Sequence, residues 1–345
     1  MEPVEQQFAF HRLARSSPRH RWWKPLLTAL LGGVFYVVFI LMVLVTGLAL
    51  ASLTPAGVGP YFDALSVLDL SNPVMFAFTL VSLILMIPAL ALAVLITGPR
   101  PIGLLSSVAG RLRWGWLAVC AGVSVAVFLV NLALSFAVGV FFPAEAEPVP
   151  VPPETSTLLI LLALSVLAVP FQAAAEEYVF RGFLMQAIGT WLRHPAFAIL
   201  LPVPLFVLGH GYDPLGQADV AVFAIFAGWI TWRTGGLEAA IAVHAVNNMT
   251  IFVLGAFGLV DVNSTEGSLG GLLLSLATMG VTAVVIVRLA DRRGVARTRT
   301  VALWPVLDPS GPVPGPVHPG PLPSQLPASG LDPQPHALGE ERRQQ

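Results

Sequence analysis

The chain has 345 residues, of which 56% are hydrophobic and only 11% are charged, and its formal net charge at pH 7 is −1. With a mean hydropathy of +0.79, this composition excludes an ordinary soluble domain and indicates a polytopic membrane protein. A single cysteine, Cys120, excludes an intrachain disulfide and a cysteine-based metal site.

Residues 1–25 are predicted to form a basic N-terminus that ends in Trp22-Trp23, a pair typical of a membrane interface. Segment 26–53 follows as an apolar span. It is well beyond the ~7–15 residues usual for the apolar core of a signal peptide, so we expect a retained transmembrane helix. Seven further apolar spans are predicted along the chain: 74–97, 115–142, 157 to the first glutamates after it, 196–211, 218–232, 237–259 and 269–287.

The predicted fold is therefore all-α, a polytopic membrane helix bundle with about eight transmembrane helices. We expect four regions along it. Residues 1–25 are a basic cytoplasmic N-terminus, 26–156 hold transmembrane helices one to three, 157–290 form the core, and 291–345 form a disordered cytoplasmic tail. The tail is predicted because prolines and glycines recur every few residues from about residue 303, a composition that cannot bury a core.

The distribution of basic residues predicts the orientation. Of the 18 lysines and arginines, all but Arg181 fall on one side of the predicted bundle, and the loops on the other side contain none. By the positive-inside rule, we expect a multi-pass protein of the plasma membrane with both termini in the cytoplasm.

Polar residues inside the apolar spans mark a candidate site. Glu176, Glu177 and Arg181 follow a mostly apolar run, and charges in hydrocarbon cost several kcal/mol each, so they usually serve a function. Glu177 and Arg181 stand one helical turn apart on one face, whereas Glu176 points about 100° away. A purely structural ion pair is the competing interpretation of this stretch.

Of seven histidines, only His210 and His244 lie within predicted spans, and Asn248 follows His244 by one turn. A helical rise of ~1.5 Å per residue places Glu176, His210, His244 and Asn248 roughly 16–26 Å from the cytoplasmic helix ends, so they can share one layer of the membrane. A carboxylate with a histidine can polarise water, and a second histidine with an asparagine can stabilise an oxyanion. Interhelical hydrogen bonding is the alternative. The same Glu176, His210 and His244 can instead hold a divalent metal such as zinc.

Three motifs, Glu-Glu-x-x-x-Arg, Phe-x-x-x-His and His-x-x-x-Asn, occur in this order on successive predicted helices. Together they resemble the CAAX-protease and bacteriocin-processing family of intramembrane proteases, which includes the type II CAAX prenyl endopeptidases. The resemblance covers about residues 157–290 and implies an intramembrane CAAX-type protease, nominally a metalloprotease. Its implied substrate is a membrane-associated peptide or protein, of the prenylated or leader-peptide type, and no nucleic acid is expected.

The resemblance also implies residue roles. Glu176 would activate water with the help of His210, His244 and Asn248 would stabilise the oxyanion, and Glu177 and Arg181 would fix the architecture. No cofactor is required by these roles, and we favour a site without a tightly bound metal because each polar residue then has a single task. Two other functions stay open: a proton- or ion-coupled transporter with the Glu/His cluster as relay, and a non-catalytic membrane scaffold. The absence of an obvious inverted repeat argues against the transporter.

Overall fold

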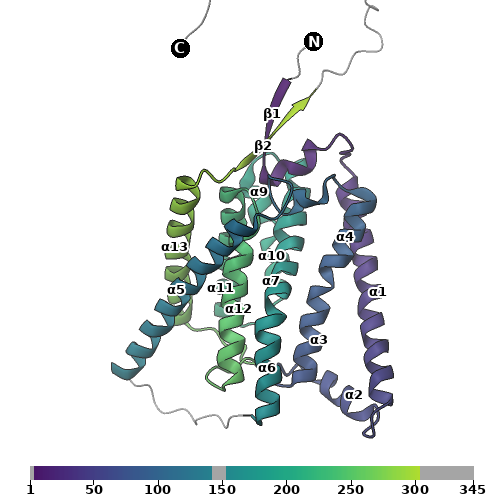
Figure 1. The fold of residues 1–345 in the computed structure, drawn as a ribbon, viewed down its shortest axis with the longest axis vertical. Coiled ribbons are helices and arrows are strands. Elements are labelled where there is room, and N and C mark those ends of the chain that lie inside the picture. Colours follow the sequence, from purple (N-terminus) through teal and green to yellow (C-terminus); the bar gives the residue numbers. More distant parts are fainter. Residues whose placement is uncertain (1–3, 142–152, 304–345) are drawn as a thin grey trace, which may run out of the picture. The chain divides into compact units, whose positions relative to one another are not determined.

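The computed structural model describes residues 4–141 and 153–303, which form a bundle of helices with one short pair of strands (Figure 1). Seven helices in this part of the chain are long and apolar enough to cross a membrane. The predicted fold class is confirmed: the chain is a multi-pass helical membrane protein. In the first half the helices are α1 Lys24–Ser52, α2 Gly59–Ser66, α3 Pro73–Ile84, α4 Met86–Thr97 and α5 Trp114–Phe141. In the second half they are α6 Thr155–Leu167, α7 Val169–Glu177, α8 Met185–Trp191, α9 Pro195–Leu200, α10 Val203–Leu208, α11 Pro214–Thr234, α12 Glu238–Ala256 and α13 Leu269–Arg292.

The predicted span 196–211 differs from the expected full-length crossing. It consists of the two short helices α9 and α10, which together cover only Pro195–Leu208. Pro202 and Pro204 lie at the start of α10, where a residue without an N–H cannot continue the ladder of α9. The span therefore adds a shorter, broken helix to the seven of membrane length. By contrast, the short predicted span 218–232 lies within α11, whose 21 residues reach about 31 Å and match a ~30 Å membrane core.

A long helical run from Thr155 to Trp191 carries the glutamate motif. Its 37 residues correspond to about 55 Å, which is longer than one crossing requires. The run is interrupted at Ala168, two residues before Pro170, and it becomes a π-helix between Tyr178 and Leu184 (η3). Wide π turns in α-helices are often found at functional sites, and this one holds Arg181.

Helix α12 lies among α5, α6, α7 and α11 and packs against each of them. The alanines of α12, Ala239, Ala240 and Ala242, pack with Trp116 of α5 and Ile230 of α11. On the side of α7, Ile241 of α12 belongs to the cluster against which Ala174 packs. This close packing brings polar residues of α7 and α12, which are far apart in sequence, within reach of each other.

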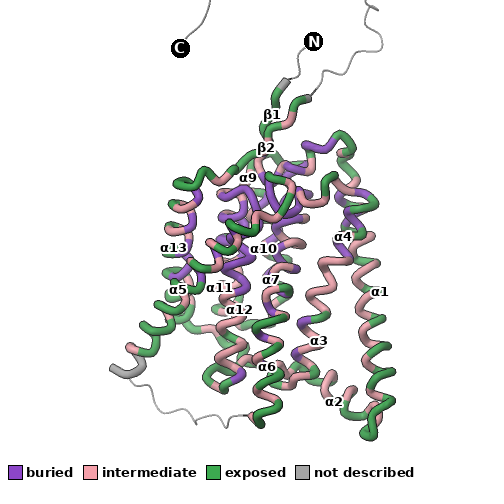
Figure 2. Tube along the Cα trace, viewed as in Figure 1, coloured by how far each residue is buried: buried purple, intermediate pink, exposed green. Residues whose placement is uncertain are grey.

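The two ends of the described chain meet at one end of the bundle. Strand β1 (Val4–Ala9) pairs antiparallel with β2 (Thr298–Leu303), with Val4 opposite Leu303 and Ala9 opposite Thr298. We call this the basic end, because the arginine-containing loop between α4 and α5 and the arginine-rich end of α13 also lie there (Figure 1). Figure 2 shows that buried positions concentrate toward this end.

Two expectations about the termini are corrected by this arrangement. The segment 1–25 is more than a polar extension: the 3₁₀ helix η1 (Phe10–Ser16) packs on α8, with Phe10 and Leu13 fully buried. Within the expected disordered tail 291–345, residues 298–303 are ordered and form β2. Both segments are rich in arginine, but the first also contains apolar side chains, such as Phe8 and Phe10, that are buried in the fold. Residues 304–345 lie outside the described part of the chain, so the predicted disorder there stays a prediction.

Candidate active site

Helix α7 ends in two buried carboxylates that face α12. Glu177 is fully buried, and its Oε1 accepts a hydrogen bond from Nη1 of Arg181 at 2.8 Å. This confirms the predicted pairing of these two residues one turn apart. The same oxygen lies 2.9 Å from Nδ1 of His244, a contact that was not predicted. Because an ionised carboxylate only accepts hydrogen bonds, Nδ1 is the donor, and Glu177 fixes the orientation of the His244 ring.

Glu176 lies on the other side of the same histidine. Its Oε1 accepts a hydrogen bond from Nε2 of Gln172 at 2.6 Å. Its Oε2 is buried, lies 3.7 Å from Nε2 of His244, and has no hydrogen-bond partner among the described residues. A separation of 3.7 Å is too long for a direct hydrogen bond, so the two atoms face each other across a gap that a third polar atom can bridge.

Asn248 joins this group through Gln172. One turn beyond His244, its Nδ2 donates to Oε1 of Gln172 at 3.2 Å, and Gln172 in turn donates to Glu176. An amide nitrogen carries two hydrogens, so Asn248 retains one for another acceptor. Sequence reasoning missed Gln172. The signal was present, because it is a polar residue one turn before Glu176 in an otherwise apolar stretch.

Aromatic rings enclose the charged residues. The guanidinium of Arg181 lies 4.5 Å from the ring centroid of Phe206, and its Nη2 donates to the carbonyl of Ala224 at 3.2 Å. The His244 ring meets Phe223 edge to face at 4.9 Å. Cation–π contacts and the exclusion of water strengthen the electrostatic interactions of the buried group.

His210 is placed differently from the expectation. Its Nδ1 lies 2.8 Å from the carbonyl oxygen of Phe206, and its ring packs against the Phe206 ring with centroids 4.8 Å apart. The Phe206 ring also lies 6.3 Å from that of His244. In the described part of the chain, His210 makes no hydrogen bond to Glu176. Its predicted assistance to Glu176 therefore stays a prediction.

Residues 155–250 match the family model described as type II CAAX prenyl endopeptidase Rce1-like. This segment is Rce1-like. It contains every candidate residue from Glu176 to Asn248, and the resemblance that the three motifs predicted is confirmed.

A curated relative extends the comparison. The chain is 31% identical over 117 residues to the uncharacterized protein YyaK of Bacillus subtilis (strain 168), a match that covers 32% of this chain. The chain spans only 38% of the length of that relative. No solved structure matches the chain.

The metal-site hypothesis fits the Rce1-like segment poorly. A zinc site needs three converging protein ligands, and Glu176, His210 and His244 were the candidates. Among the described residues, no three histidine, cysteine, aspartate or glutamate side chains form such a group. Glu176 and His244 supply two, while the neighbouring Glu177 already binds Arg181. We therefore derive no chemical step through a metal.

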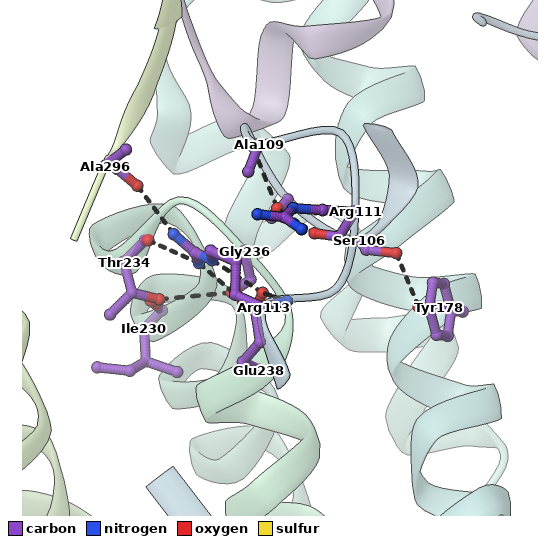
Figure 3. A network of polar contacts seen from close by, with 11 residues as sticks. Ser106, Ala109, Arg111, Arg113, Tyr178, Ile230, Thr234, Gly236, Glu238 and Ala296 are labelled. Atoms are coloured by element: carbon purple, nitrogen blue, oxygen red, sulfur yellow. Dashed lines mark hydrogen bonds and ion pairs between the residues drawn. The ribbon is translucent and has the colours of Figure 1, made fainter. Parts of the chain in front are cut away.

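A second polar network holds the helices of the Rce1-like segment in place (Figure 3). Arg113, at the start of α5, forms a bidentate pair with the buried Glu238 in the first turn of α12, with Nη2 to Oε2 at 2.7 Å and Nε to Oε1 at 2.9 Å. Arg113 also donates to the carbonyls of Thr234 and Ala296. The hydroxyl of Ser106, in the same loop, lies 2.8 Å from that of Tyr178 in η3. The loop thus contacts both α12, which carries His244, and η3, which carries Arg181.

Proposed function

We propose that this chain is an intramembrane endopeptidase in which Glu176 activates a water molecule that hydrolyses a peptide bond. One observation carries the proposal. The buried Oε2 of Glu176 has no hydrogen-bond partner among the described residues and faces Nε2 of His244 at 3.7 Å. The match to a family of endopeptidases supports the same reaction class.

The residues divide the reaction into three tasks. Glu176 accepts a proton from the water as the oxygen attacks the carbonyl carbon of the peptide bond. The free N–H of Asn248 stabilises the carbonyl oxygen as it becomes negative. His244 donates to the same oxygen from Nε2 as the imidazolium, with its Nδ1–H held by Glu177. Collapse of the tetrahedral intermediate breaks the C–N bond, and the proton held by Glu176 passes to the leaving amine. No covalent enzyme intermediate is needed.

Gln172, Glu177 and Arg181 position these groups. Gln172 binds both Glu176 and Asn248, which fixes the base relative to the oxyanion donor. Arg181 neutralises Glu177 at 2.8 Å and allows that carboxylate to remain buried beside a second one. The site therefore holds its polar groups in the reactive arrangement before substrate binds, which is the main source of electrostatic catalysis.

The substrate we propose is a membrane-associated peptide or protein of the prenylated or leader-peptide type, reached within or near the bilayer of the plasma membrane. The basic end faces the cytoplasm in this proposal. Reporter fusions after residues 105 and 300 are then expected to give a cytoplasmic signal, and a fusion after residue 264 an external one. A cytoplasmic signal at 264 would contradict the proposed orientation.

The decisive experiment replaces Glu176 by glutamine, which keeps the size of the side chain and removes the base. Comparative proteomics of membranes from cells with the wild type and with Glu176→Gln identifies candidate cleaved peptides, and these are then assayed with purified protein. We expect cleavage to fall by about 10²–10⁴-fold while folded protein is retained. Glu266→Gln, which changes an exposed glutamate in the same way, is the matched control. Unchanged cleavage by Glu176→Gln would refute the mechanism.

A further inference from the structure

A hollow lies at the basic end, and its lining does not include Glu176 or Glu177. It is bordered by the segment that precedes α1, by the start of α1, by the end of α4 and by the η3–α8 run, and it encloses about 450 Å³ including its open mouth. Its mouth is lined by the exposed Arg19 and the half-buried His20 and Lys24, and its wall includes the buried Leu105 and the half-buried Phe183. The hollow is therefore cationic at the mouth and apolar inside.

The cations at this mouth are not neutralised within the described residues. None of Arg19, His20 and Lys24 takes part in an ion pair there. Arg15 and Arg21 add further positive charge. Burial and, after it, the positive charges of Arg15, Lys24 and Arg21 lower the pKa of His20. A negatively charged ligand would relieve this repulsion.

A buried amide gives the second indication of a ligand. Gln186, which lines the hollow, is 2% exposed, and its Nε2 donates to the carbonyl of Leu104 at 2.8 Å. Its Oε1 is buried and has no partner among the described residues. An unsatisfied buried acceptor is costly, and a ligand that donates a hydroxyl hydrogen would satisfy it.

We propose that this hollow binds the headgroup of one anionic phospholipid. The phosphate would meet Arg19 and Lys24, and a headgroup hydroxyl would donate to Gln186. Two features favour a lipid over a soluble anion: the apolar inner wall, and the exposed Trp22 and Trp23, which mark the membrane interface at this level. Basic pockets between membrane helices are known to hold anionic headgroups. This site is independent of the proposed proteolytic activity.

The test uses purified full-length protein in detergent, titrated with phosphatidylglycerol, with phosphatidylcholine or with inorganic phosphate while its thermal midpoint is measured. Phosphatidylglycerol is expected to raise the midpoint of the wild type, and the other two are not. In the double variant Arg19→Gln/Lys24→Gln, the apparent affinity for phosphatidylglycerol is expected to fall about 30-fold, since two surface cations are lost. The matched control, Arg292→Gln/Arg293→Gln, removes two exposed charges at the same end and should bind as the wild type does.

Native mass spectrometry of the wild type provides a measurement that needs no variant. One phosphatidylglycerol molecule is expected to remain bound in the presence of excess phosphatidylcholine. Equal binding by the Arg19/Lys24 variant and the wild type would overturn the proposal, as would the loss of all bound lipid from the wild type. A midpoint raised by inorganic phosphate alone would also overturn it, because the ligand would then be a soluble anion.

Discussion

Two fully buried glutamates, Glu177 and Glu238, each pair with an arginine, but their oxygen atoms are used differently. Both oxygens of Glu238 are bonded to Arg113, which also donates its backbone N–H at 2.9 Å (Figure 3). Glu177 has one oxygen shared between Arg181 and His244, and its Oε2 is buried without a partner among the described residues. Glu176 likewise has one unsatisfied oxygen.

The difference separates a structural pair from a reactive group. A bidentate arginine fixes the orientation of a carboxylate and stabilises it. Few lone pairs are then left to accept a proton or to bind a substrate. Unsatisfied buried oxygens cost free energy, and proteins keep them where they serve a function. On this criterion Arg113 and Glu238 hold α12 in place, while Glu176 and His244 fit the reactive roles that we propose for them, with Glu177 as the residue that positions His244.

The largest effect is expected from removal of the arginine in the reactive pair. Arg181→Ala leaves the fully buried Glu177 without its cation, so the free energy of unfolding should fall by about 3–5 kcal/mol. Arg113→Ala is the matched variant. Its side chain is 15% exposed, which lets water reach the remaining carboxylate, and we expect a smaller loss of about 1–3 kcal/mol. Thermal unfolding of the detergent-solubilised proteins measures both. Normal folded yield but lost activity in Arg181→Ala would instead place Arg181 at the substrate.

A smaller effect, on kcat, should distinguish the two arginine-paired carboxylates, Glu177 and Glu238. Glu177→Gln removes the charge that orients His244, and kcat per folded molecule is expected to fall by about 10²-fold. Glu238→Gln weakens the pair with Arg113 and lowers stability, but it touches neither Glu176 nor His244, so kcat per folded molecule should be retained. If Glu177 acts by orienting His244, the loss in Glu177→Gln appears in kcat rather than in KM. Equal losses of kcat in both variants would show that the two pairs do not differ in function.

The same contrast explains what the sequence could and could not predict. Helical spacing alone placed Glu177 beside Arg181 and Asn248 one turn from His244. The contact between Glu177 and His244 depends on the packing of α7 against α12, which no local pattern encodes. Arg113 counted only as a basic loop residue in the orientation argument, because its partner Glu238 lies 125 positions away.

The termini show a similar limit. Charge composition marked segment 1–25 as basic, but it did not reveal that Phe10 and Leu13 are buried and that η1 contacts α8. Proline content predicted a tail from about residue 303, and the described chain ends there with β2. The pairing of β2 with a strand about 300 positions earlier needed the folded structure.

The smallest effect concerns His11, a buried histidine that is bonded to a backbone carbonyl and, among the described residues, to no carboxylate. Nε2 of His11 lies 3.0 Å from the carbonyl oxygen of Arg193, and since a carbonyl only accepts, Nε2 carries the hydrogen. Nδ1 is buried and has no partner among the described residues, so protonation would place a new hydrogen where nothing accepts it. Burial is the main cause that lowers the pKa of His11, and the positive charges of Arg12 and His194 lower it further.

Acid should therefore weaken the contact between η1 and α8. The unfolded chain takes up the proton near the ordinary histidine pKa of about 6.5, whereas the folded chain does so only at lower pH. The stability contributed by neutral His11 is full above about pH 6.5 and is lost as pH falls from there through the lowered pKa of the folded state. Because other histidines titrate in the same range, the measurement compares the thermal midpoint of the wild type with that of His11→Asn from pH 7.5 to pH 5. The wild type should lose more stability than the variant on acidification. Parallel curves would contradict this prediction, because they would mean that His11 is not held neutral in the folded chain. The unsatisfied buried nitrogen at this position would then cost less free energy than the unsatisfied oxygens of Glu176 and Glu177.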